Sequence, residues 1–129
     1  VEYAPLFERY QLGTTIWSPL ASGALTGKYL DGIPDGSRAS LAGYEWLKKL
    51  MVDSERGQER MQRVARLMPV AEALGTSLSQ LAIAWCLLNK NVSTVILGAS
   101  KVEQLEENLR AVEVLPLLDE SVLAQLAAI

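Results

Sequence analysis

Two segments of this chain carry the residue pattern of β-strands, and the helical segments around them restrict the fold. Residues 14–18 combine β-branched and aromatic side chains, and residues 92–97 end in three consecutive apolar residues. β-Branched and aromatic residues favour strands, and a continuous apolar run is typical of a parallel strand buried on both faces. Strands that alternate with helices predict an α/β fold with a parallel sheet.

Helical periodicity is present in five further segments. Apolar residues recur there at helical spacing, and Gly13 and Gly75 follow two of the segments as terminators. Thr76-Ser77 is a candidate N-cap, whereas Pro69 is expected to kink or divide the helix that contains it. The expected helices span residues 3–11, 57–74, 76–89, 101–112 and 119–129.

The size of the chain limits its organisation. A chain of 129 residues, of which 50% are hydrophobic, can bury one ordinary core. Two parallel strands do not make a stable sheet alone, so further strands are expected from a preceding segment of chain or from a partner. The first residue, Val1, is not an initiator methionine, which fits this expectation. We therefore expect one domain or part of one.

Charge and residue usage exclude several classes of function. A net charge of -3 argues against a general binder of nucleic acid or acidic lipid, since those partners require an excess of Lys and Arg. The lack of histidine removes the commonest general base and transition-metal ligand, and the single cysteine, Cys86, has no disulfide partner. No apolar run reaches the roughly 20 residues of a membrane helix. These features predict a soluble, cytoplasmic protein without a metal.

Both predicted strands run into turns of small residues. Ser18-Pro19-Leu20 follows the first strand, and Gly98-Ala99-Ser100 follows the second. Ligands of parallel α/β proteins collect at these carboxyl ends. The loop from residue 21 to 44 is long enough to expect a function or disorder, and its turn formers are Gly23, Gly27, Gly32, Pro34, Gly36 and Gly43.

Four polar residues after the second turn fall on one helix face. Ser100, Gln104, Glu107 and Asn108 are spaced at i, i+4, i+7 and i+8. A serine hydroxyl and backbone N–H groups at a helix N-terminus can hold a phosphate, and a carboxylate with an amide can bind the edge of a base such as adenine. The pattern also fits an ordinary N-cap at Ser100, which is the commoner arrangement. In that alternative Glu103, Glu106 and Glu107 form a solvated acidic face.

Several separated motifs support a more specific interpretation. They are WSPLA at 17–21, GKY at 27–29, GIP at 32–34, SR at 37–38, YEWL at 44–47, LAIAWCL at 81–87 and LGAS at 97–100, followed by Gln104, Glu107 and Asn108. On these residues the chain resembles the C-terminal part of the aldo-keto reductase superfamily. Within it, the resemblance is closest to the branch that contains the β-subunits of voltage-gated potassium channels.

The resemblance implies a (β/α)8 barrel that binds NADPH and passes its hydride to a small aldehyde or ketone. Residues 1–129 would be a C-terminal fragment of that single domain, with about strands 7 and 8 and their helices. The acid tyrosine of the family, with its supporting lysine and aspartate, lies on earlier strands, so the resemblance assigns no catalytic residue to this chain. Many relatives carry an arginine where Gln104 stands, which leaves the choice between NADPH and NADH open.

The resemblance also assigns cofactor contacts residue by residue. Strand-end residues would line the nicotinamide and pyrophosphate, two basic residues of the long loop would reach the phosphates and adenosine, and the second turn with its helix would take the 2′-phosphate and adenine. Solvated loop charges at 28 and 38, and a core tryptophan at 17, are the alternatives. The residues implied are Trp17, Ser18, Pro19, Leu20, Ala21, Lys28, Arg38, Gly98, Ser100, Gln104, Glu107 and Asn108.

Three functions are compatible with these observations. The first is an NADPH-dependent carbonyl reductase, the second is a cofactor-binding auxiliary subunit of a potassium channel, and the third is a fragment that is inactive when isolated. The partners expected are a small carbonyl substrate and no nucleic acid. A homo-oligomer and a channel partner both remain open.

Overall fold

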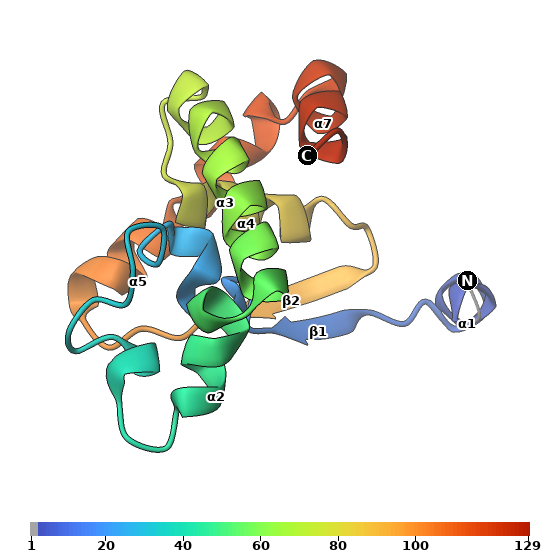
Figure 1. The fold of residues 1–129 in the computed structure, drawn as a ribbon. Coiled ribbons are helices and arrows are strands. Elements are labelled where there is room, and N and C mark those ends of the chain that lie inside the picture. The colour runs from blue at the N-terminus through green and yellow to red at the C-terminus, as the bar shows by residue number, and fades with distance from the viewer. Residues whose placement is uncertain (1–2) are drawn as a thin grey trace.

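The computed structural model describes residues 3–129, a mostly helical α/β chain that contains a two-stranded parallel sheet (Figure 1). Strand β1 (Thr14–Trp17) pairs with β2 (Val92–Ile96), and Trp17 lies opposite Ile96 in the register. Both predicted strands and their parallel pairing are therefore confirmed. Because the strands are parallel, the chain leaves both of them at the same edge of the sheet.

Five helices correspond to the segments predicted from periodicity. Their N-caps explain where two of them begin: the Ser77 side chain caps the helix that starts at Leu78, and the Asp119 side chain accepts a hydrogen bond from the Val122 N–H. The predicted N-cap at Ser77 is confirmed. These helices are α1 (Ala4–Tyr10), α3 (Glu55–Ala73), α4 (Leu78–Leu87), α5 (Val102–Leu109) and α7 (Glu120–Ala127).

Shorter helical elements occupy the connections. The long loop predicted between residues 21 and 44 contains two 3-10 turns. The first packs against α3 and α4, and the second packs against the short helix Glu45–Lys48. The short elements are η1 (Ala21–Thr26), η2 (Arg38–Ser40), α2 (Glu45–Lys48), the π-helical η3 (Lys49–Asp53), α6 (Ala111–Val114) and η4 (Leu115–Leu117).

Pro69 does not divide its helix, although the sequence suggested a kink or a break there. α3 runs through it as one helix of 19 residues. Proline removes one backbone hydrogen bond. Val70 and Ala71, which follow the proline, are buried in the same core as Met61 and Val64, which precede it. Burial of this continuous apolar face offsets the cost of the proline.

The helix predicted over residues 101–112 is interrupted at Arg110. The Arg110 N–H bonds to the Glu107 carbonyl at 3.2 Å, an i to i-3 contact that tightens the end of α5. α6 then starts at Ala111, and its buried residues Ala111 and Val114 face the core beside α4. We attribute the break between α5 and α6 to the packing of α6 against α4, which the local periodicity does not reveal.

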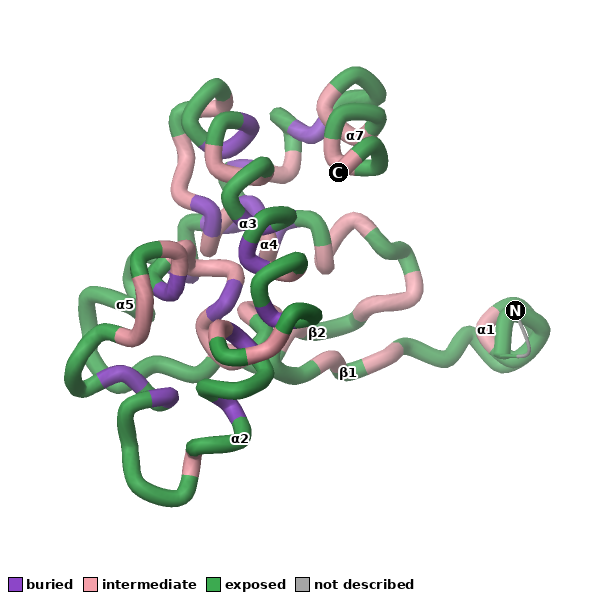
Figure 2. Tube along the Cα trace, viewed as in Figure 1, coloured by how far each residue is buried: buried purple, intermediate pink, exposed green. Residues whose placement is uncertain are grey.

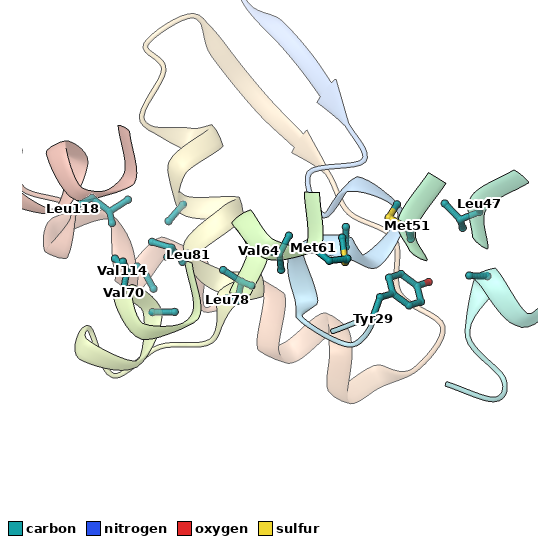
Figure 3. Close-up of a cluster of buried hydrophobic side chains, with 14 residues drawn as sticks. Tyr29, Leu47, Met51, Met61, Val64, Val70, Leu78, Leu81, Val114 and Leu118 are labelled. Carbon is teal, nitrogen blue, oxygen red and sulfur yellow. The ribbon is translucent and has the colours of Figure 1, made fainter. Parts of the chain in front are cut away.

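The core lies among the helices rather than around the sheet. Figure 3 shows the buried side chains, which extend from Leu47, Met51 and Tyr29 through Met61 and Val64 on α3 to Leu78 and Leu81 on α4, and then to Val114 and Leu118. No single helix in residues 3–129 is long and apolar enough to cross a membrane. α3 and α4 meet the length and composition requirement only as a pair, and the two helices are bent by 90°.

The sheet is largely uncovered, which corrects the expectation that the second strand is buried on both faces. Figure 2 shows β1 and β2 mainly in the colours of exposed and intermediate residues. Trp17 is 80% exposed and its partner Ile96 is 53% exposed. The apolar run of β2 therefore lacks, among the described residues, the neighbours that would bury it on both faces.

Gly57 permits the close approach of α3 to η3, and its replacement by alanine tests this packing. A Cβ atom at residue 57 would lie 2.8 Å from the Leu50 carbonyl oxygen and 2.8 Å from the Met51 carbonyl carbon. These backbone atoms cannot move away as a flexible side chain can. We expect Gly57→Ala to lower the free energy of unfolding by about 1–2 kcal/mol, although alanine favours helix by about 1 kcal/mol.

Urea denaturation of Gly57→Ala and of Gln58→Ala, an exposed neighbour in the same helical turn, measures the effect. Gln58→Ala should change the free energy of unfolding by no more than about 0.5 kcal/mol. A Gly57→Ala protein as stable as the wild type would contradict the close contact between α3 and η3.

Candidate cofactor-binding site

The sheet brings the two predicted turns to one edge, as expected from the parallel pairing. Trp17 and Ile96 are paired at the carboxyl ends of β1 and β2. The chain continues from β1 through Ser18-Pro19-Leu20 and from β2 through Leu97 to Ser100. Figure 1 shows both strand arrows pointing toward the same side of the molecule. Residues 80 positions apart in sequence therefore lie at the same sheet edge.

The turn after β1 has an unusual backbone conformation. Ser18, Ala21 and Ser22 have positive φ angles of 54°, 47° and 59°. The turn is held by hydrogen bonds of 2.9 Å from the Ala21 N–H to the Ser18 carbonyl and from the Gly23 N–H to the Leu20 carbonyl. Non-glycine residues in this region cost about 1–3 kcal/mol each and cluster at ligand sites and switches. The strain is thus located where the sequence predicted a ligand.

Lys28 is brought back to this turn by its side chain. Its Nζ lies 5.1 Å from the centroid of the Tyr29 ring, and its Cε and Nζ occupy the space where a side chain at Gly23 would lie. The Lys28 N–H also donates a hydrogen bond of 3.3 Å to Thr26 Oγ1. The predicted cation and the strand-end turn are therefore in one place.

Ser100 and Gln104 form the second part of the candidate site. The Ser100 N–H and hydroxyl both donate to Gln104 Oε1, at 3.0 Å and 3.2 Å. Ser100 lies before the helix, and Lys101 is the N-cap residue, without a side-chain cap. The prediction of an ordinary N-cap at Ser100 is thus wrong, and so is the prediction of a helix face that begins at Ser100. The contact between positions 100 and 104 is nevertheless made.

Glu107 and Asn108 differ in their surroundings. Glu107 is exposed, as are Glu103 and Glu106, which agrees with the solvated acidic face named as the alternative. Asn108 is 5% exposed and lies against the protein. Gln80 fixes this part of α5, because its Nε2 donates a hydrogen bond of 2.9 Å to the Glu107 carbonyl.

The remaining candidates are distributed around the two groups. Trp17 is not a core residue, which excludes that alternative, and Gly98 is exposed with open space around the position of a Cβ atom. Arg38 is exposed on η2, which packs against α2, and the structure does not bring it to either group. Pro19 lines an apolar hollow of about 390 Å³ with Leu25, Leu81 and Trp85.

Sequence reasoning missed residues that hold the site in place. Tyr29 and Thr26 lie within or next to the GKY motif, but only Lys28 was assigned a role. Gln80 completes a capping box with Ser77: its side chain accepts from the Ser77 N–H while Ser77 Oγ accepts from the Gln80 N–H. The spacing of Ser77 and Gln80 is a recognised helix-start signature and could have identified Gln80.

Two groups among the described residues have clearly displaced pKa values, the Cys86 thiol and the Glu45 carboxyl. Burial raises the pKa of the Cys86 thiol, which keeps it protonated and unreactive at neutral pH. The pKa of Glu45 is lowered by hydrogen bonds from its own N–H and from the Gly43 N–H, the latter at 3.0 Å. Residues 3–129 hold no group of three or more His, Cys, Asp or Glu that could bind a metal ion. At the strand ends the described residues present the Ser100 donors and the Lys28 charge.

Ligand sites of parallel α/β proteins lie at the carboxyl ends of their strands, where this chain places Lys28 and the Ser100 donors. The sequence model of the aldo/keto reductase family matches residues 2–129, and the chain belongs to this family. The predicted superfamily is thereby confirmed. Membership implies oxidoreductase activity on carbonyl substrates with NAD(P)H, and the mixed α/β fold is consistent with part of a barrel.

Proposed function

We propose that this chain contributes the NADPH-binding part of a reductase that converts an aldehyde or ketone to an alcohol. Residues 1–129 would form the C-terminal part of a (β/α)8 barrel, with β1 and β2 as about strands 7 and 8; Val1 and Glu2 lie outside the described residues. The observation that carries the proposal is the pairing of a strained turn and a cation after β1 with two converging donors after β2.

The donors of Ser100 suit an anionic oxygen. Its N–H and hydroxyl already converge on a single acceptor, Gln104 Oε1. Rotation of the Gln104 side chain would free both donors for a phosphate oxygen and leave the Gln104 amide N–H₂ as a third donor. Hydrogen bonds to a charged oxygen are roughly twice as strong as those to a neutral one. This arrangement supports the 2′-phosphate of NADPH as the ligand of Ser100 and Gln104.

The residues after β1 suit the opposite end of the same ligand. The exposed indole of Trp17 offers a flat apolar surface to a nicotinamide ring, and Lys28 offers a positive charge to the pyrophosphate. When bound, the nicotinamide supplies the hydride that reduces the carbonyl carbon. The residues of this chain bind and orient the dinucleotide, and the proton donor for the new hydroxyl comes from another part of the barrel.

The remaining candidates complete the proposed bed. Gly98 leaves space for the ligand to approach the backbone after β2. Glu107 and Asn108 would hydrogen-bond to the edge of the adenine, and the adenine would have to reach the Asn108 side chain, which is buried. The proposed contacts are Trp17, Ser18, Pro19, Leu20, Ala21, Lys28, Gly98, Ser100, Gln104, Glu107 and Asn108; Arg38 is not among them, because η2 packs against α2 and carries it apart from both groups. The channel-subunit alternative has no observation in its favour among residues 3–129, so it is not proposed.

Replacement of Ser100 by alanine tests the assignment of the 2′-phosphate. Loss of a hydrogen bond to a charged group costs about 1.5–3 kcal/mol, so NADPH binding should weaken about tenfold or more, whereas NADH binding should change little. Quenching of tryptophan fluorescence in the complete protein encoded by the gene measures both affinities. Ser121→Ala, an exposed serine on α7, is the matched control and should bind both dinucleotides as the wild type does.

Two outcomes would contradict the proposal at different levels. If Ser100→Ala weakened the binding of NADPH and of NADH equally, Ser100 would not be the residue that binds the 2′-phosphate. A wild-type protein that binds neither dinucleotide would refute the proposed reductase.

A further inference from the structure

Tyr29 joins the cation of the candidate site to the strained turn after β1. It is 1% exposed, and its hydroxyl donates a hydrogen bond of 3.3 Å to the Ser22 carbonyl, in the left-handed part of the turn. The Lys28 ammonium lies 5.1 Å from the centroid of the Tyr29 ring. Figure 3 shows Tyr29 within the buried cluster, between Met61 and Leu47. A single fixed ring thus touches both parts of the β1 side of the site.

Gly23 provides the space that the Lys28 side chain occupies. A Cβ atom at Gly23 would lie 2.6 Å from Lys28 Cε and 2.8 Å from Lys28 Nζ. The same atom would lie 3.5 Å from Tyr29 Cε2, an ordinary contact. The lysine stem therefore crosses directly over the glycine, between the turn and the tyrosine ring.

Backbone contacts fix the base of the lysine. Thr26 Oγ1 donates a hydrogen bond of 2.8 Å to the Gly23 carbonyl and accepts one of 3.3 Å from the Lys28 N–H. Lysine loses side-chain rotamer freedom when it is ordered, which opposes binding. Contacts at both ends of Lys28 supply part of that ordering before a ligand arrives, which lowers the cost of binding.

We propose that Tyr29 is a positioning residue of the cofactor site. Its ring holds the Lys28 ammonium over the β1 turn, and its hydroxyl holds the Ser22 carbonyl in the conformation that the turn requires. Tyr29 acts through Lys28 and the turn and does not itself contact the dinucleotide. This inference rests on the proposed function, because Lys28 is the residue that would meet the phosphates.

The first test detects the contact between Lys28 and the Tyr29 ring by NMR, without any ligand. The face of an aromatic ring shifts the NMR signals of protons above it upfield, so the Lys28 ε-methylene protons should be shifted upfield in the wild type and in Tyr29→Phe. The shift should be lost in Tyr29→Leu and in Gly23→Ala, which displaces the lysine without removing a charge. Gly43→Ala is the control for Gly23→Ala, because Gly43 also has a positive φ, 85°, but open space around it. Normal ε-methylene shifts in the wild type would overturn the proposal.

The second test measures NADPH affinity in the complete protein. A cation–π contact at an exposed site contributes about 0.5–1 kcal/mol, so Tyr29→Leu should weaken NADPH binding about two- to fivefold. Gly23→Ala should weaken it more than Gly43→Ala does. In a Lys28→Met background, Tyr29→Leu should weaken NADPH binding by a smaller factor than in the wild type, since only the turn is then left for Tyr29 to position.

The outcomes separate this inference from the proposed function. If the wild type binds NADPH and Tyr29→Leu weakens binding by the same factor with and without Lys28, the tyrosine is only structural and the inference is wrong. If the wild type binds neither NADPH nor NADH, the proposed function fails, and the positioning role fails with it even where the NMR contact is present.

Discussion

Replacement of Lys28 by methionine is expected to weaken NADPH binding about ten- to hundredfold, since interactions with a charged group contribute about 1.5–3 kcal/mol. Methionine keeps an unbranched, flexible side chain and removes only the positive charge. The charge lies at the strained turn after β1, above the Tyr29 ring, where the pyrophosphate is proposed to bind. The effect should appear in KM for NADPH more than in kcat, as expected for a group that binds ground state and transition state alike.

Titration of the complete protein at two salt concentrations checks this result. The difference between wild type and Lys28→Met should shrink at high salt, because ions screen an exposed charge. Lys90→Met is the matched control, since Lys90 is an exposed lysine that precedes β2 and so lies toward the opposite edge of the sheet. Equal losses of affinity in the two variants would show that Lys28 acts only through net charge and would exclude a direct phosphate contact.

Replacement of Leu47 by alanine is expected to cost about 2–5 kcal/mol of unfolding free energy, the largest effect on stability that we predict. Leu47 is fully buried, at 0% exposure, in the cluster that contains Met51 and Tyr29. Removal of its methyl groups leaves a cavity next to η2, the element that carries Arg38. A loss of this size is a large part of the stability of a small domain.

The neighbouring Leu50 provides a control of the same chemistry. It is 38% exposed, so Leu50→Ala should cost clearly less than Leu47→Ala in the same denaturation experiment. Similar losses for the two variants would mean that Leu47 is not in the core. The midpoint of urea unfolding should fall in Leu47→Ala with an unchanged slope, since a smaller slope would indicate a change in the unfolded or native ensemble.

Local patterns were sufficient for most of the regular elements. The β-branched, aromatic and apolar residues of 14–18 and 92–97 predicted the two strands, which the structure has at Thr14–Trp17 and Val92–Ile96, and the capping residue Ser77 marked the start of α4. Such signals act between residues that are close in sequence, so they are readable without the fold. The division allowed at Pro69 does not occur and the helix predicted through Arg110 is interrupted, because burial of the residues beyond the proline and packing of α6 on α4 act between distant segments.

The candidate site divides in the same way. The i, i+4 spacing predicted that Ser100 and Gln104 share a helix face, whereas Ser100 lies before the helix and bonds to Gln104 Oε1. The motif GKY identified Lys28, but not that its side chain crosses Gly23 and lies over Tyr29. The sequence also could not predict that Asn108 is buried while Glu107 beside it is exposed, since both belong to one run of polar residues.

Residue pattern alone was thus enough for the α/β class, the parallel strands and the family, because hydrophobic periodicity, caps and motifs are properties of short segments. Tertiary structure decided which of the candidate residues come together. The register of β1 and β2 places the two turns at one edge, and the strained backbone of Ser18–Gly23 brings Lys28 onto Tyr29. These arrangements depend on contacts between segments far apart in the chain, and such contacts form only when the molecule folds.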